Sequence, residues 1–240
     1  MEQETDLNEV EKRIDALLGK AGFYLQTYRS IDALNILREA RRILDGSDVR
    51  NQVRAVLYRD FGRAYVQSGN LGEGLKSFIQ SYEAFEDNND KASAAGMIAG
   101  YYLRDGKVRE ADEYAEKALQ LATAPELLSA PYQIKGGIAI VEEDYPRAIE
   151  LMTKAAEYAE RSHCITDLAM IIMDLSVIFM KMGMQETALS EVYRAERYVK
   201  ECHNLDLYLR CAIRRAKILF IMGKDSEAKE LIMALDEQQA

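Results

Sequence analysis

Small and apolar residues recur along the chain at a spacing that fits paired α-helices. Six positions carry a small residue every 37 to 41 residues, and we call them the anchors: Ala33, Gly74, Ala111, Ala148, Ala188 and Ala228. An apolar side chain follows each anchor by four residues, and a small or apolar one follows by seven. Positions i, i+4 and i+7 share one helix face, so the pattern predicts an amphipathic helix around each anchor.

A second helix is predicted before each anchor. Nine residues earlier stands an apolar or aromatic residue, which is Tyr24, Tyr65, Tyr102, Ala139, Phe179 or Leu219. Between the two helices four units carry a glycine: Gly69, Gly106, Gly183 and Gly223. Helices commonly end at a residue in the left-handed conformation, which glycine adopts easily. Six helix–turn–helix units are therefore predicted, with approximate bounds 6–46, 47–88, 89–123, 124–162, 163–203 and 204–240.

This pattern resembles the tetratricopeptide repeat (TPR) family, and the resemblance covers nearly the whole chain. The stretch "FGRAYVQSGNLGEGLKSF" (61–78) carries the family's small residue, tyrosine, glycine and anchor in order. The usual unit has about 34 residues, and the longer units here are similar to those of bacterial peptide-receptor regulators and some eukaryotic scaffold proteins. The resemblance implies an all-α fold, a right-handed α-solenoid of helix-turn-helix repeats, forming one superhelical domain over residues 1–240.

The resemblance also implies a binding groove, because the first helix of each TPR unit usually lines the concave surface that holds a partner. The corresponding positions are Arg59, Arg63, Gln67, Met97, Gly100, Arg104, Gln133, Gly137, Met170, Met173, Asp174, Lys181, Arg210, Arg214 and Lys217. Flexible methionines in the middle would adapt to varied partners, and the basic ends would attract an acidic partner or one with a free carboxylate. Two alternatives stay open: the methionines and glycines can be ordinary packing residues, and the arginines a solvated, salt-bridged face.

Composition narrows the class of partner and the compartment. A net charge of −9 argues against nucleic acid or an anionic membrane as the partner. The acidic start "MEQETDLNEVEKR" is unlike a signal peptide, and the three cysteines form no CxxC pair. We therefore expect a cytoplasmic protein.

The glycine-rich stretch "SGNLGEGLKS" (68–77) invites comparison with a phosphate-binding loop. Such a loop needs lysine directly after its last glycine and a strand before it. Here Leu75 separates Gly74 from Lys76, and a helical pattern precedes the stretch. The stretch is better explained as an inter-helix turn.

Two Cys–His pairs, "SHC" (162–164) and "ECH" (201–203), are the remaining candidates for chemistry. Together they offer a Cys2His2 set that suits zinc, but without the usual CxxC or HxxxH spacing. Cys164 as a nucleophile would need an orienting group and an oxyanion site, and the nearby Asp167 alone does not provide them. We expect no catalytic residue, metal or cofactor.

The sequence therefore predicts a non-catalytic scaffold or adaptor that binds a protein or peptide in a solenoid groove. The alternative is a peptide-responsive sensor or regulatory module of a bacterial signalling or transcription-regulating protein. The last predicted helix, "DSEAKELIMALDEQQA", leaves Ile232 and Met233 without an evident covering element. We expect a second copy of the chain, in a homodimer through the C-terminal unit, or a further domain to cover them.

Overall fold

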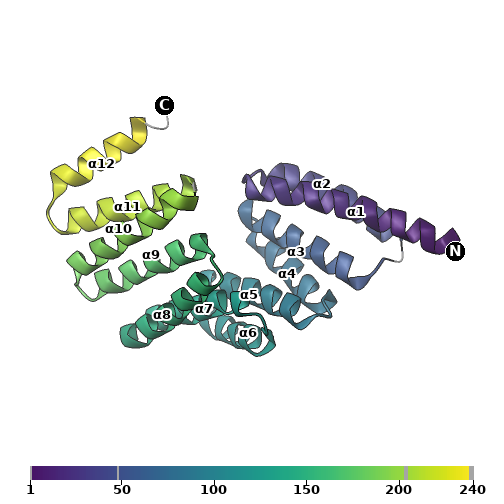
Figure 1. Ribbon diagram of the computed structural model, residues 1–240, viewed down its shortest axis with the longest axis horizontal. Helices are drawn as coiled ribbons and strands as arrows, with labels where there is room; N and C mark the ends of the chain where they lie inside the picture. The colour runs from purple at the N-terminus through teal and green to yellow at the C-terminus, as the bar shows by residue number, and fades with distance from the viewer. Residues whose placement is uncertain (1, 48, 203–204, 238–240) are drawn as a thin grey trace. The chain divides into compact units, whose positions relative to one another are not determined.

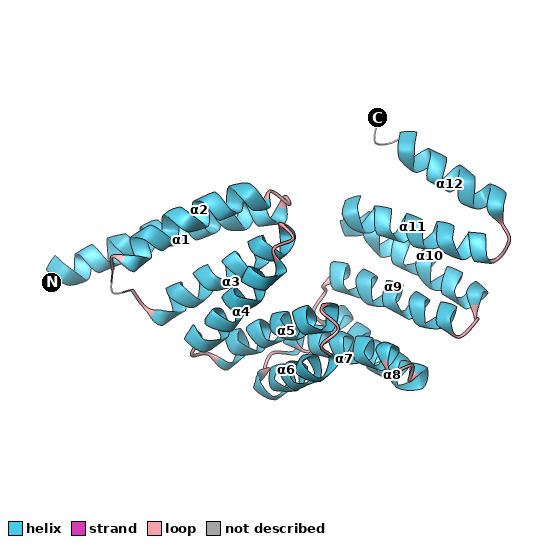
Figure 2. Ribbon diagram, turned by 180° about the vertical axis from the view of Figure 1, so that it is seen from behind, coloured by secondary structure: helices cyan, strands magenta, loops and turns pink. Residues whose placement is uncertain are grey.

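Paired α-helices joined by short loops make up most of the described chain. The computed structural model describes residues 2–47, 49–202 and 205–237, and Figure 2 shows only helices and loops in them. The helices are α1 (Glu2–Gln26), α2 (Ser30–Asp45), α3 (Asn51–Gln67), α4 (Leu71–Ala84), α5 (Asn88–Arg104), α6 (Val108–Leu121), α7 (Ser129–Val141), α8 (Tyr145–Arg161), α9 (Ile165–Lys181), α10 (Gln185–Cys202), α11 (Leu205–Ile221) and α12 (Asp225–Glu237), with a short 3-10 helix, η1 (Pro125–Leu127). The described helices form six sequential pairs, as the repeat pattern predicts.

The chain divides into two compact units, Met1–Thr123 and Ala124–Ala240. Figure 1 shows α1–α6 of the first unit as three hairpins in chain order, and α7–α12 of the second in the same way. The boundary coincides with the predicted limit between the third and fourth repeats. The prediction that all six repeats form one superhelical domain stays a prediction, and each unit is described here by itself.

Each unit has its own hydrophobic core. In the first, α1, α2 and α3 bury a cluster that includes Ile14, Leu37 and Leu57. In the second, the main cluster extends from α7 to α11 and includes Met152 and Ile172. All six anchors are buried, as the packing of one helix on its partner requires.

The turn inside every helix pair has one geometry. Five residues before each anchor the backbone adopts a positive φ, at Tyr28 (57°), Gly69 (81°), Gly106 (76°), Glu143 (61°), Gly183 (73°) and Gly223 (74°). The next backbone N–H then donates to the carbonyl five residues back, for example from Asn70 to Tyr65 at 2.8 Å and from Asp144 to Ala139 at 2.9 Å. This closure satisfies a carbonyl at the end of the first helix. The glycine-rich stretch 68–77 is such a turn, followed by the start of α4.

Close packing inside two pairs depends on a missing side chain. A Cβ at Gly62 of α3 would lie 2.4 Å from the ring of Phe78 on α4. A Cβ at Gly136 of α7 would lie 2.9 Å from the terminal methyl of Met152 on α8. Gly62 and Gly136 each precede their anchor by twelve residues, where the other units carry Ala or Ser. In these two pairs glycine leaves the space that the facing Phe78 or Met152 side chain occupies.

In two of the helix pairs, a buried serine links the first and second helices by a hydrogen bond. Ser81 on α4 donates its hydroxyl to the carbonyl of Ala55 on α3 at 2.9 Å. In the fourth repeat Ser129 on α7 donates to the carbonyl of Ala155 on α8 at 3.0 Å. Ala55 and Ser129 occupy equivalent repeat positions, and so do Ser81 and Ala155. The same inter-helix hydrogen bond is thus donated by the second helix in one pair and by the first helix in the other.

Candidate functional site

The predicted groove residues all lie on the first helices of their pairs. In the first unit α3 carries Arg59, Arg63 and Gln67, and α5 carries Met97, Gly100 and Arg104. In the second unit α7 carries Gln133 and Gly137, α9 carries Met170, Met173, Asp174 and Lys181, and α11 carries Arg210, Arg214 and Lys217. The first helices of the second unit are neighbours, since α9 contacts both α7 and α11.

In the first unit, two of the predicted arginines already form ion pairs with one buried carboxylate. Asp60 on α3 is only 3 % exposed. Its carboxylate accepts a hydrogen bond from Arg59 Nε at 3.2 Å and lies 3.8 Å from Arg63 Nη1. Burial raises the pKa of Asp60, and the two guanidinium groups oppose that shift. Arg59 and Arg63 therefore compensate a buried carboxylate.

The other predicted groove residues of the first unit do not form a cluster of this kind. Gln67 Nε2 donates to the carbonyl of Leu25 at 3.0 Å, which ties α3 to the end of α1. Arg104 is exposed at the last residue of α5, and Met97 and Gly100 are half-buried. Gln67 therefore has a structural contact that the sequence did not reveal.

In the second unit, polar side chains from three successive first helices converge, and we call them the α7–α9–α11 cluster: Gln133, Asp174, Arg210 and Arg214. Gln133 Nε2 donates to Asp174 Oδ2 at 2.8 Å across α7 and α9. Burial raises the pKa of Asp174, opposed by the hydrogen bond from Gln133 and by the charges of Arg214 and Arg210. All four residues of the cluster were predicted as groove residues.

The arginines of this cluster differ from their neighbours in having no ion pair. Burial lowers the pKa of Arg214, Asp174 raises it, and the positive charge of Arg210 lowers it again. Within the described residues no carboxylate lies within ion-pair distance of Arg210 or Arg214. By contrast, Arg215 Nη1 lies 2.8 Å from Glu196 Oε2. The α7–α9–α11 cluster thus carries two arginines and one carboxylate, and neither arginine is within ion-pair distance of that carboxylate in the described structure.

One predicted groove residue belongs to the core. Met173 is 3 % exposed, and its sulfur lies 3.2 Å from Cys211 Sγ of α11. It cannot line an open surface, so the packing alternative holds for this residue. Met170 is half-buried and packs against the same core cluster. Gly137 is also half-buried, whereas Lys181 and Lys217 are exposed.

The Cys–His pairs do not assemble a site in the described part of the chain. His163 is exposed, with φ of 55°, at the turn between α8 and α9. Burial raises the pKa of the Cys164 thiol, chiefly by desolvation, with a smaller contribution from Asp167. The Cys202 side chain and His203 lie outside the described residues. No group of three His, Cys, Asp or Glu side chains suited to a metal occurs in the part that is described.

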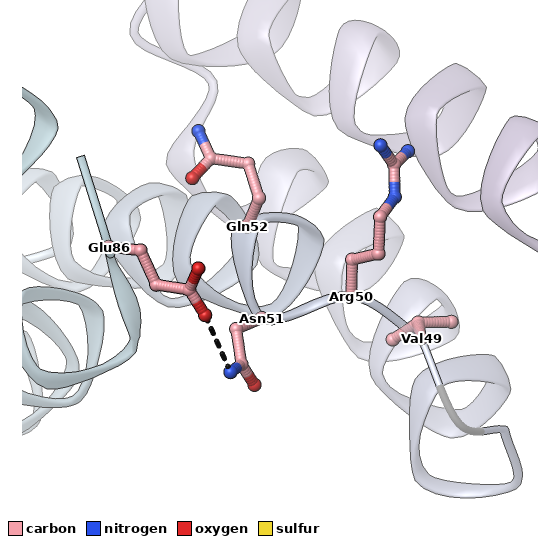
Figure 3. A pocket seen from close by; sticks show the side chains of 5 residues that line it. All are labelled: Val49, Arg50, Asn51, Gln52 and Glu86. Carbon is pink, nitrogen blue, oxygen red and sulfur yellow. Dashed lines mark hydrogen bonds between the residues drawn. The ribbon is translucent and has the colours of Figure 1, made fainter.

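A polar pocket of about 470 Å³ lies in the first unit, where α2 leads into α3. Figure 3 shows Asn51 and Glu86 on one side of it, joined by a hydrogen bond of 3.2 Å. The pocket's one cationic group, Arg50, points to the other side and binds Glu11, with Nη2 2.6 Å from Oε2. This ion pair lowers the pKa of Glu11. The pocket therefore offers no uncompensated positive charge to a ligand.

An apolar hollow of about 530 Å³ lies between α11 and α12. Its lining includes Ile213, Phe220, Ile221 and Ile232, all at least half exposed. The sequence analysis identified Ile232 and Met233 but missed the α11 residues. The sequence did indicate one of them, because Phe220 occupies a repeat position that is apolar in every other unit.

None of the described helices is long and apolar enough to cross a lipid bilayer. No model of a known protein family matches the chain, and no curated protein matches it.

Solved structures show the fold. NprR in complex with its cognate peptide NprX is 13 % identical, with a TM-score of 0.73 over 93 % of this chain and 66 % of that one. Aspartyl phosphate phosphatase F from Bacillus subtilis is 14 % identical, with a TM-score of 0.68 over 98 % and 73 %. The TPR-like repeats of a Podosopora anserina kinesin light chain are 16 % identical, with a TM-score of 0.59 over 80 % and 98 %. The chain is a TPR-like repeat protein, as the sequence pattern predicts.

Proposed function

We propose that this protein is a non-catalytic binding module whose first-helix faces hold a peptide or an extended protein segment. The α7–α9–α11 cluster is the observation that carries the proposal. Three successive first helices contribute polar side chains to one place, and the cluster sets two arginines against the single carboxylate of Asp174. Polar side chains placed in this way orient a ligand and determine its specificity.

The non-catalytic part of the proposal rests on the state of the candidate nucleophile. A catalytic thiol needs a depressed pKa, because the thiolate is the reactive form. Burial instead raises the pKa of Cys164, and its neighbour His163 is exposed on a turn. If the protein turned over a substrate and Cys164→Ser abolished that turnover, the non-catalytic part of the proposal would be overturned.

Direct selection of ligands tests the binding function. A mixed library of short synthetic peptides is passed over the immobilised protein, and retained peptides are identified and titrated individually by calorimetry. We expect saturable binding of a defined subset, weakened in Arg210→Glu/Arg214→Glu. The control is Lys229→Glu, an exposed residue on α12. Retention of the same peptides by the cluster variant would move the binding site elsewhere.

A second candidate is a regulatory module whose conformation responds to the bound peptide. The likeness to NprR, solved with its cognate peptide, favours it. On this proposal a selected peptide would change hydrogen exchange in helices far from the cluster, whereas a simple adaptor would show protection only around α7, α9 and α11. Exchange measured with and without the peptide separates the two.

A further inference from the structure

The α7–α9–α11 cluster differs from the other arginine-rich part of the first-helix faces in how its carboxylate is paired. Around Asp60 two arginines compensate one buried carboxylate at 3.2 and 3.8 Å. Around Asp174 the carboxylate oxygen Oδ2 is instead occupied by Gln133 at 2.8 Å. The two arginines of α11 therefore keep donors that are not used within the described chain.

Helical spacing brings these two cations together. Arg210 and Arg214 are four residues apart on α11, so their side chains emerge on the same face. Like charges at this spacing repel each other, and Arg214 has also lost part of its hydration through burial. An anion placed between them would relieve the repulsion and replace the lost water.

From this geometry we infer that Arg210 and Arg214 form a subsite for a carboxylate of the bound peptide, with Asp174 limiting the positive charge of the subsite. The inference rests on the proposed binding function and adds the chemistry that the ligand must bring. A guanidinium presents two parallel N–H donors that match the two oxygens of a carboxylate. With Asp174 ionised, two arginines leave one net positive charge, which a single carboxylate neutralises.

The ligand carboxylate can be the C-terminal α-carboxylate or an Asp or Glu side chain, and the probes distinguish these sources. The peptide library is prepared in two forms, one with a free C-terminus and one amidated. A requirement for the free C-terminus identifies the α-carboxylate. Equal binding of both forms, with Asp or Glu enriched at one position, identifies a side chain. Either result supports the subsite.

The decisive comparison uses variants that remove one charge each. Arg214→Gln should weaken binding of the selected peptides by about tenfold or more, since a partly desolvated charge pair loses a partner. Arg210→Gln should weaken it by a smaller factor, because Arg210 is exposed. Lys229→Gln removes the same charge from an exposed site on α12 and should change affinity little. Circular dichroism and thermal melting confirm that each variant is folded. Asp174→Asn should still bind peptides that carry a carboxylate, and this binding should depend more strongly on salt concentration. A loss of packing alone would not increase the salt dependence.

The outcomes separate this inference from the function on which it rests. Peptides that bind the wild type and Arg214→Gln equally, with no preference for carboxylates, would overturn the subsite and leave the binding function standing. Selection of no peptide by the wild type would overturn both.

Discussion

At the residue scale, helix pairs keep their separation by matching the sizes of facing residues. Gly62 faces Phe78, and the equivalent Gly136 faces Met152. In these two pairs the missing side chain leaves room for the large residue on the facing helix. The glycines are required by the neighbour across the pair, since both lie inside helices where alanine has the higher helix propensity.

Gly62→Ala should therefore destabilise the protein despite that propensity. The new Cβ would lie 2.4 Å from the Phe78 ring, which is itself buried. We expect a loss of about 1–3 kcal/mol in the free energy of unfolding, measured by urea denaturation. Gly72→Ala on α4 is the matched control, because its Cβ would meet nothing within 4 Å.

Combining Gly62→Ala with Phe78→Leu tests the proposed cause. The smaller side chain should recover part of the loss, with a coupling free energy of roughly 1 kcal/mol for residues in contact. Additive losses in the double variant would show that Phe78 is not the obstacle.

At the element scale, a turn geometry shared by all six pairs is imposed on two residues unsuited to it. Tyr28 and Glu143 have positive φ where the other turns have glycine. For a residue with a Cβ, the left-handed region costs about 1–2 kcal/mol. The strained backbone at these two residues therefore lowers the stability of the α1–α2 and α7–α8 pairs.

Glu143→Gly should therefore stabilise the protein, against the usual effect of introducing glycine. We expect a gain of roughly 0.5–1 kcal/mol, after the extra chain entropy of glycine offsets part of the relieved strain. The chemical denaturation midpoint reports it. Glu142→Gly, one residue earlier at φ of −77°, should lower the midpoint instead. A lower denaturation midpoint for both variants would contradict the proposed backbone strain at Glu143.

The sequence predicts these elements well because one physical requirement recurs in every unit. Small anchors occur six times and turn glycines four times, so the chain repeats a signal that a single helix would show once. The site was harder to predict. In α9 the run "AMIIM" (169–173) is apolar throughout, so periodicity cannot tell that Met173 faces the core. The compensation of Arg59 and Arg63 by Asp60 depends on side-chain conformation, which the spacing leaves open.

At the scale of the whole molecule, the two compact units should respond separately to damage in one core. Leu37 belongs to the core of the first unit and Ile172 to that of the second, and both are fully buried. Leu37→Ala should lose about 2–5 kcal/mol and reduce hydrogen-exchange protection mainly in residues 2–123. Ile172→Ala should do the reverse. Equal loss of protection along the chain would indicate a single cooperative unit.

The C-terminal repeat also carries a consequence for assembly. Ile232 and Met233 on α12 are 50 % and 63 % exposed, beside the apolar hollow on α11. Apolar patches of this kind favour association, and we expect a second copy of the chain to cover them in a symmetric dimer. Sedimentation velocity should then show a concentration-dependent dimer that Met233→Glu shifts towards monomer. Ser190→Glu, on the exposed side of α10, is the control. A wild type that stays monomeric at every concentration would contradict the dimer.

The buried serine that joins α3 to α4 and α7 to α8 has a consequence for how relatives of this protein should be aligned. The hydrogen bond can be donated from either helix, because Ser81 and Ser129 make it from opposite sides. Selection on such a bond acts on two alignment columns jointly and leaves each column free to hold alanine. A profile that scores columns one at a time would rank both as weakly conserved. Because the acceptor is a main-chain carbonyl, the bond needs serine in only one of two columns 26 positions apart, and the third repeat, with Ala92 and Ala118 there, has serine in neither.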